Sequence, residues 1–127
     1  MAIHNGEEYL LEQIKSIKSQ SLEPDEIIFI DDCSTDKSYE IITKLSESNK
    51  SIKAIRFSRK FGYQESIYCG LEHSTGENMI TMDSDLQHPP ELILDLLNKA
   101  NEGYDIVNMV RNKAVKKTFI SKIGSSF

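Results

Sequence analysis

Acidic side chains follow two short apolar runs of this sequence. Asp31 and Asp32 come after the first run, and Asp83 and Asp85 come after the second. Such runs are typical of buried strands in a parallel sheet, whose carboxyl ends share one edge. Carboxylates gathered at one edge are electrostatically costly unless something positive is bound there. The pattern therefore predicts a cation-dependent ligand site at that edge.

The second acidic cluster has the spacing of a metal site. Asp83 and Asp85 are separated by one residue, so both carboxylates can reach one ion from a turn, and Gln87 offers another oxygen. Hard oxygen ligands suit Mg²⁺ or Mn²⁺. In a competing interpretation Asp85 simply caps the helix that Pro89 and Pro90 open.

The elements that must position these groups alternate along the chain. Apolar residues at helical spacing predict helices, and short apolar runs predict strands. The expected strands comprise residues 2–3, 27–30, 52–57, 79–82 and 106–110. The expected helices surround residues 10–17, 41–45, 64–73 and 92–100, the second capped by Ser34, Thr35 or Asp36 and the last ended by Gly103. Strict alternation predicts an α/β fold, an open and mostly parallel sheet whose ligands bind beyond the carboxyl ends of its strands.

Length and composition set limits on the class of protein. The 127 residues fit one domain, and 39% hydrophobic with 28% charged residues is a globular composition. No apolar run approaches the ~18 residues that a membrane span needs, and the N-terminus has no secretory pattern. Two cysteines without CxxC spacing predict neither a disulfide framework nor a zinc site. We therefore expect a cytoplasmic location.

Charge is distributed unevenly along the chain. Residues 1–110 hold all 20 acidic residues and ten of the 15 basic ones, a formal charge of −10, whereas residues 111–127 hold five basic residues and no acid. An acidic body argues against non-specific nucleic-acid binding, which needs a basic face. The basic tail predicts contact with a phosphate or an anionic membrane surface, with a solvated helix face as the plainer interpretation.

Five segments carry motifs in a fixed order: residues 4–7, 31–36, 58–64, 83–91 and 104–111. The fourth reads DSDLQHPPE and strongly resembles the metal-binding motif of family 2 glycosyltransferases with the GT-A fold. The others are similar to that family's first-strand end, nucleotide turn, "SRNFGHQ" motif and acceptor-side strand. The likeness is greatest to the branch of dolichyl-phosphate mannose synthases and bacterial polyprenyl-phosphate sugar transferases.

This resemblance implies roles for the acidic clusters. Asp31 and Asp32 would contact the base and ribose of the nucleotide. Asp83 would lie near the ribose or the metal-linked phosphate, while Asp85 and Gln87 would hold Mg²⁺ or Mn²⁺ on the donor diphosphate. A Rossmann-like nucleotide-binding part of a GT-A fold is the expected architecture.

The resemblance also implies a reaction, the metal-dependent, inverting transfer of a sugar from a UDP- or GDP-linked donor to a polyprenyl phosphate. Donor-side contacts would come from five further residues: His4, Asn5, Glu7, Arg59 and Gln64. Arg111 would face the acceptor phosphate. Because a phosphate acceptor is already ionised, it needs positioning rather than a general base. Asp85 and Arg111 are thus the residues expected to act in catalysis.

Several positions depart from the family pattern. His4 stands in place of the usual Tyr, Lys60 of Asn, Tyr63 of His and Glu65 of a small apolar residue, and Cys33 in place of a common Gly. These departures weaken the lipid-phosphate branch. They keep a glycan-elongating transferase of the same family as an alternative.

Two other classes compete with an active transferase. A receiver-like phosphoacceptor domain has a similar order of acidic residues, with Lys113 after the last strand, but does not require residues 85–90. A binding module is the other class, because the family's catalytic domain is longer than this chain. We expect residues 1–110 to form a nucleotide-sugar-binding domain with an incomplete first strand, and residues 111–127 to be the truncated start of an acceptor-side region. Such a chain would bind nucleotide with weak or no turnover, and an exposed sheet edge would favour homo-oligomers.

Overall fold

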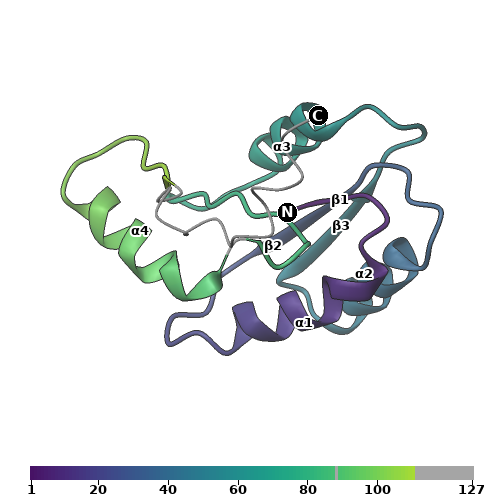
Figure 1. The fold of residues 1–127 in the computed structure, drawn as a ribbon, viewed down its shortest axis with the longest axis horizontal. Helices are drawn as coiled ribbons and strands as arrows, with labels where there is room; N and C mark the ends of the chain where they lie inside the picture. The colour runs from purple at the N-terminus through teal and green to yellow at the C-terminus, as the bar shows by residue number, and fades with distance from the viewer. Residues whose placement is uncertain (88, 111–127) are drawn as a thin grey trace, which may run out of the picture.

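A computed structural model describes residues 1–87 and 89–110 of the chain. Strands and helices alternate as the periodicity predicts (Figure 1): β1 (Ala2–Ile3), α1 (Glu7–Lys18), β2 (Ile27–Asp31), α2 (Ser38–Ser48), β3 (Ile52–Arg56), α3 (Tyr63–Glu72), the 3-10 turn η1 (Pro90–Leu92) and α4 (Ile93–Asn101). His88, Arg111 and the rest of the predicted basic tail lie outside the described residues. Across residues 1–87 and 89–110, no helix has the length and apolarity that crossing a membrane requires.

The order in which the chain adds strands to the sheet reverses at β1. Its three strands are parallel and lie in the order β1-β2-β3, with Ala2 opposite Ile30 and Ile30 opposite Ile55. Ala2 also forms a parallel bridge with Asp83, which must therefore lie on the other side of β1. The chain thus builds outward from β1 to β3 and then returns across β1. Such a reversal of strand order is where open α/β sheets bind ligands.

The two sides of this reversal place helices on opposite faces of the sheet. Figure 1 shows α1 and α2 on one face and α3 on the other. Right-handed crossovers produce this arrangement when the chain first moves in one direction along the sheet and then in the other. The prediction of an open parallel α/β sheet is confirmed.

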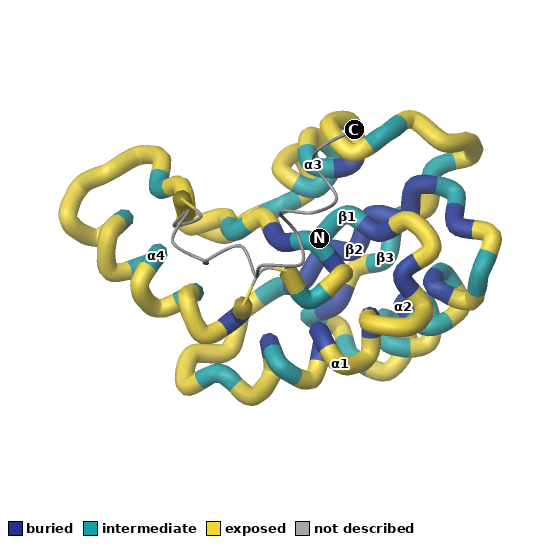
Figure 2. Tube along the Cα trace, viewed as in Figure 1, coloured by how far each residue is buried: buried dark blue, intermediate teal, exposed yellow. Residues whose placement is uncertain are grey.

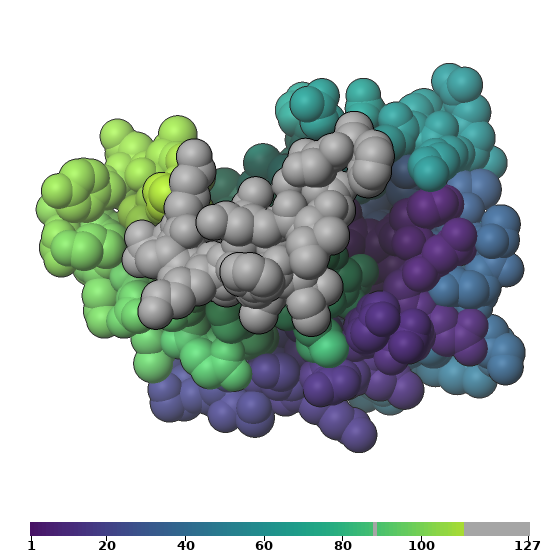
Figure 3. Space-filling model, viewed as in Figure 1, coloured from purple at the N-terminus to yellow at the C-terminus, as the bar shows by residue number. Residues whose placement is uncertain are grey.

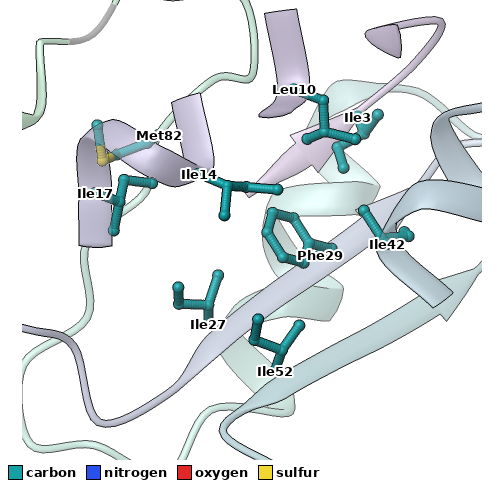
Figure 4. Packing of buried hydrophobic residues seen from close by; sticks show 9 residues of the cluster. All are labelled: Ile3, Leu10, Ile14, Ile17, Ile27, Phe29, Ile42, Ile52 and Met82. Carbon is teal, nitrogen blue, oxygen red and sulfur yellow. The ribbon is translucent and has the colours of Figure 1, made fainter. Parts of the chain in front are cut away.

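The core lies between the sheet and helices α1 and α2, which cover one of its faces. Leu10, Ile14 and Ile17, the predicted stripe of α1, are buried against the sheet, and Phe29 at the centre of β2 has no exposed surface. Figure 4 shows these side chains converging with those of Ile3, Ile27, Ile42, Ile52 and Met82. Burying a large apolar side chain contributes about 1.5–3 kcal/mol. This cluster holds β1 and β2 in place, and their ends form the site.

The sequence prediction is wrong in two later segments. Residues 79–82 form no strand, and only the bridge at Asp83 reaches the sheet. Residues 106–110 are irregular, with Ile106 and Val110 exposed by 79% and 87%. Apolar composition alone does not make a strand, because a strand also needs a hydrogen-bonding partner along its length.

Helix α4 has the predicted position but not the predicted burial. It ends as expected before Gly103, whose φ of 100° and N–H bond to the Ala100 carbonyl are typical of a helix end. None of its residues is buried, and Figure 2 shows only exposed and half-buried positions along it. In the space-filling view α4 and the segment after it form one end of the molecule (Figure 3).

Candidate functional site

The strand ends bring three of the four predicted acidic residues to one edge of the sheet. Asp31 ends β2, opposite Ile3 and Arg56 of the neighbouring strands, and Asp32 follows it. Asp83 reaches the same sheet through its bridge to β1. Parallel pairing therefore produces the shared edge that the sequence predicts.

Asp31 is fully buried and is neutralised within the fold. Its oxygens accept from the Ser34 N–H at 3.3 and 3.4 Å, and Oδ2 lies 3.3 Å from Nε of Arg56. The same guanidinium donates to the Ser34 carbonyl at 3.0 Å and lies over the Tyr39 ring at 4.6 Å. A buried carboxylate requires such a partner. Sequence reasoning missed Arg56, although a cation near the end of the predicted strand 52–57 was a usable signal.

Asp32 shapes the loop between β3 and α3. The carboxylate is almost wholly buried and accepts from the N–H groups of Phe61 at 2.7 Å and Gly62 at 2.9 Å. Gly62 has a φ of 113°, a conformation that side-chain-bearing residues rarely adopt. Both acids of the nucleotide turn thus hold backbone in place, and their contact with base and ribose stays a prediction.

The loops after β1 and β2 are hydrogen-bonded to each other. Asn5 N–H donates to Ser34 Oγ at 3.0 Å, and its side-chain oxygen accepts from Thr35 N–H at 2.8 Å. Gly6 N–H donates to Ser38 Oγ at 2.9 Å. These bonds join positions about 30 residues apart, so the two loops form one unit.

The N-termini of the two helices that follow are hydrogen-bonded to each other. Asp36 accepts from Glu7 N–H at 3.0 Å and from Ser38 N–H at 2.9 Å, while Glu7 accepts from Lys37 N–H at 3.1 Å. Burial alone would raise the pKa of Asp36, but its hydrogen bonds from Ser38 and Glu7 outweigh that and lower it. Helix α2 therefore begins at Ser38, later than the predicted caps imply. A carboxylate therefore already accepts from the first N–H group of each helix.

Backbone strain is concentrated at this edge. Among the described residues, the non-glycine positions with positive φ are Asn5 at 53°, Cys33 at 56° and Leu86 at 63°. Each lies just beyond a strand end or the Asp83 bridge, and such conformations persist where the surroundings fix them. A Cβ on Gly6 would lie 3.0 Å from Ser84 Oγ, so the β1 loop packs directly on the loop of the second acidic cluster.

The second acidic cluster is only partly open to solvent, because Asp83 is half-buried. Asp85 is exposed, and its Oδ1 accepts from Gln87 N–H at 3.1 Å within the loop. No side chain caps η1, so the interpretation of Asp85 as a helix cap is wrong. Burial raises the pKa of Tyr63, and so do a hydrogen bond with Asp83 and the negative charges of Asp83 and Asp85. Both carboxylates therefore lie near one tyrosine hydroxyl.

The donor set at this cluster fits a cation shared with a ligand. Within residues 1–87 and 89–110 no three or more His, Cys, Asp or Glu side chains gather into a protein-only cation site. Mg²⁺ is commonly held by one or two carboxylates together with substrate phosphates. Asp83 and Asp85, one half-buried and one exposed, suit that arrangement, with Gln87 next to them.

The remaining predicted residues that the structure describes lie around the same edge. His4 Nδ1 lies 2.8 Å from the Asp32 carbonyl oxygen. Arg59 lies over the Phe61 ring at 4.6 Å, and Gln64 is exposed in the first turn of α3. Arg111 lies outside the described residues, so its place is not defined.

Known proteins match this chain along nearly its whole length. The sequence profile of "Glycosyl transferase family 2" matches residues 1–126. The uncharacterized glycosyltransferase YkcC of Bacillus subtilis is 40% identical over 111 residues, 87% of this chain and 34% of that protein. The undecaprenyl-phosphate 4-deoxy-4-formamido-L-arabinose transferase of Klebsiella pneumoniae is 42% identical over 95 residues, 74% of this chain and 29% of that protein. The chain thus spans about a third of these relatives.

Solved structures share the fold. Residues 1–349 of TarS from S. aureus superpose with a TM-score of 0.69 at 22% identity, over 91% of this chain and 38% of that one. The same protein in complex with UDP gives a TM-score of 0.65 at 21% identity, over 87% and 36%.

Proposed function

The chain belongs to glycosyl transferase family 2, and on that premise we propose that it forms the nucleotide-sugar-binding part of an enzyme that transfers a sugar to a polyprenyl phosphate. The observation that carries the proposal is the carboxylate pair Asp83 and Asp85 at the point where the strand order reverses. A UDP complex of the structurally similar TarS supports a nucleotide donor. The name of the Klebsiella relative supports a polyprenyl-phosphate acceptor.

The occupied helix ends support dependence on a cation. Diphosphates are often bound by the free N–H groups of a helix N-terminus. Here Asp36 accepts from the first N–H group of α1 and of α2, and Glu7 accepts from the N–H group of Lys37 just before α2. A diphosphate at this acidic edge therefore needs a positive partner, and Mg²⁺ or Mn²⁺ held by Asp83, Asp85 and Gln87 would supply it. Bound there, the ion would neutralise charge on the leaving diphosphate.

The chain's own residues would bind and orient the donor. The turn at Asp31 and Asp32, with His4 and Asn5 beside it, would contain the base and ribose, and its internal hydrogen bonds keep it in one shape. Inverting transfer requires the acceptor oxygen opposite the leaving diphosphate. Arg111 would place an ionised acceptor phosphate there, without a general base.

Titration calorimetry on the full chain tests the proposal. We expect UDP or GDP to bind in the presence of Mn²⁺ and to lose affinity when the metal is chelated. Asp85→Asn should weaken metal-dependent binding at least ~10-fold, because one charged ligand is lost. Asp95→Asn, an exposed acid on α4, is the matched control and should bind like the wild type. Absence of binding to both nucleotides would refute the proposal.

The acceptor class needs a separate experiment. The departures at His4 and Lys60 keep a glycan acceptor as the second candidate. We expect vesicles with polyprenyl phosphate, but not soluble glycans, to change the affinity of the chain for the nucleotide. The basic residues 111–127 would favour an anionic surface on the cytoplasmic face. Family membership removes the receiver-like alternative, since the whole chain matches a transferase family.

A further inference from the structure

Asp32 lies at the centre of a ring of contacts that joins three strand ends. Its carbonyl oxygen contacts the His4 ring after β1, and its carboxylate holds Phe61 and Gly62 after β3. The ring closes where Lys60 Nζ lies 3.1 Å from Nε2 of His4. His4 and Lys60 are two of the positions at which this sequence departs from the family pattern, and the structure brings them together.

The donors and acceptors in these contacts indicate which nitrogen of His4 carries a hydrogen. A carbonyl oxygen can only accept, so Nδ1 of His4 carries the hydrogen and Nε2 accepts from the Lys60 ammonium. This places an imidazole nitrogen, rather than a carboxylate, against the lysine. Lys60 forms no ion pair within the described part of the chain, unlike Lys44 and Lys99. Its ammonium group has two further N–H donors.

Lys60 lies at the edge that carries the second acidic cluster. His4 is two residues beyond Ala2, which bridges to Asp83, and the β1 loop packs on Ser84. Tyr63, three residues after Lys60, shares a hydrogen bond with Asp83. The loops that carry His4 and Lys60 thus both border the carboxylates proposed to hold the cation.

We propose that Lys60 binds a phosphate group of the ligand, and that His4 and Asp32 are positioning residues for it. The phosphate belongs either to the donor diphosphate or to the acceptor, since both present the same charged oxygens. The inference rests on the proposed function and adds a residue to that site. Carboxylates already accept from the first N–H group of α1 and of α2, so a charged side chain such as Lys60 is the stronger source of positive charge at this edge.

Lys60→Ala tests the binding role in calorimetry of the full chain with UDP and GDP in the presence of Mn²⁺. We expect affinity about tenfold weaker, as for loss of one charge-assisted hydrogen bond. The salt dependence of binding should also decrease, because a screened contact is lost. Lys60→Arg should restore most of both. Lys50→Ala, an exposed lysine before β3 at the opposite end of the sheet, should match the wild type.

His4 variants separate positioning from direct contact. His4→Ala should weaken nucleotide binding less than Lys60→Ala does and leave part of the salt dependence. His4→Gln, whose amide oxygen can still accept from Lys60, should recover affinity. A loss that persists in His4→Gln and leaves the salt dependence unchanged would overturn the positioning role.

Sedimentation with neutral phospholipid vesicles, with and without polyprenyl phosphate, distinguishes the two phosphate sources. Weaker vesicle binding by Lys60→Ala with unchanged UDP and GDP affinity would assign the acceptor phosphate, and the reverse would assign the donor. If wild type binds nucleotide and Lys60→Ala equals it in every assay, the inference is refuted while the proposed function stands. If wild type binds neither nucleotide nor vesicles, both are refuted.

Discussion

The first three strand–helix units and the segment after them differ in how well their side chains are packed. With the exceptions of Met82 and Pro90, the buried apolar residues of the described chain lie between Ile3 and Ile52. Helix α4 has no buried residue, and the segment after it is largely exposed. The nucleotide turn therefore rests on a packed scaffold. The carboxylates at Asp83 and Asp85 lie where that scaffold meets the less packed segment, which is consistent with the proposed site for an ion and a diphosphate.

The largest expected effect on stability comes from truncating a core side chain. Phe29→Ala should lower the free energy of unfolding by about 3–5 kcal/mol, because a fully buried ring is removed. Leu97→Ala in α4 should lower it by less than about 1 kcal/mol, since that side chain is only half-buried. Urea unfolding of both variants measures the difference. Equal losses would show that α4 belongs to the same packed core.

A second contrast concerns the two acidic clusters. Asp32→Asn should lower the free energy of unfolding by about 1–3 kcal/mol. The amide NH₂ of Asn would face one of the two backbone N–H groups that now donate to the carboxylate. Asp85→Asn should change it little, because Asp85 is exposed. Hydrogen exchange at the Phe61 and Gly62 amides should quicken in Asp32→Asn alone. Protected amides in that variant would contradict the role assigned to Asp32.

The same contrast explains what the sequence could and could not predict. Where a helix or strand packs on the core, as with Leu10, Ile14 and Ile17, periodicity gave the correct element and the correct face. Residues 79–82 and 106–110 have equally apolar sequences but lack a partner strand along their length among the described residues. An apolar pattern describes one segment of sequence, whereas a strand also requires hydrogen bonds to a second segment.

The site was predictable in location rather than in detail. Acidic residues after strands indicated the correct edge, because parallel strands end together. The pairing of Asp31 with Arg56, and the hydrogen bonds of Asp36 and Glu7 that join the N-termini of the two helices, depend on contacts across about 25 to 30 residues. No local signal encodes such distant hydrogen bonds. His4 and Lys60 showed only as separate departures from a motif.

A smaller effect is expected from acid. The lowered pKa of Asp36 means that its ionised form stabilises the folded state, so this contribution is present above the unfolded pKa, near 4. It should be lost as the pH falls through the folded-state pKa. Asp36→Asn should lower stability by about 1 kcal/mol at pH 7 and flatten the acid dependence. Asp95→Asn in the first turn of α4 serves as control, and an equal flattening there would refute the assignment.

The smallest effect concerns strain at the two acidic clusters. Cys33 and Leu86 both have left-handed backbone conformations. Comparing Gly with Ala at each position isolates that strain from the loss of the side chain, so Cys33→Gly should be more stable than Cys33→Ala by about 1 kcal/mol.

In helix α3, Cys69→Gly should instead be less stable than Cys69→Ala by a similar amount, which calibrates the sign. If the segment around Leu86 can relax, the advantage of Gly over Ala should be smaller there than at Cys33. Equal advantages in urea unfolding would mean that the loop of Asp83 and Asp85 is held as firmly as the nucleotide turn. The site would then be preorganised at both of its ends.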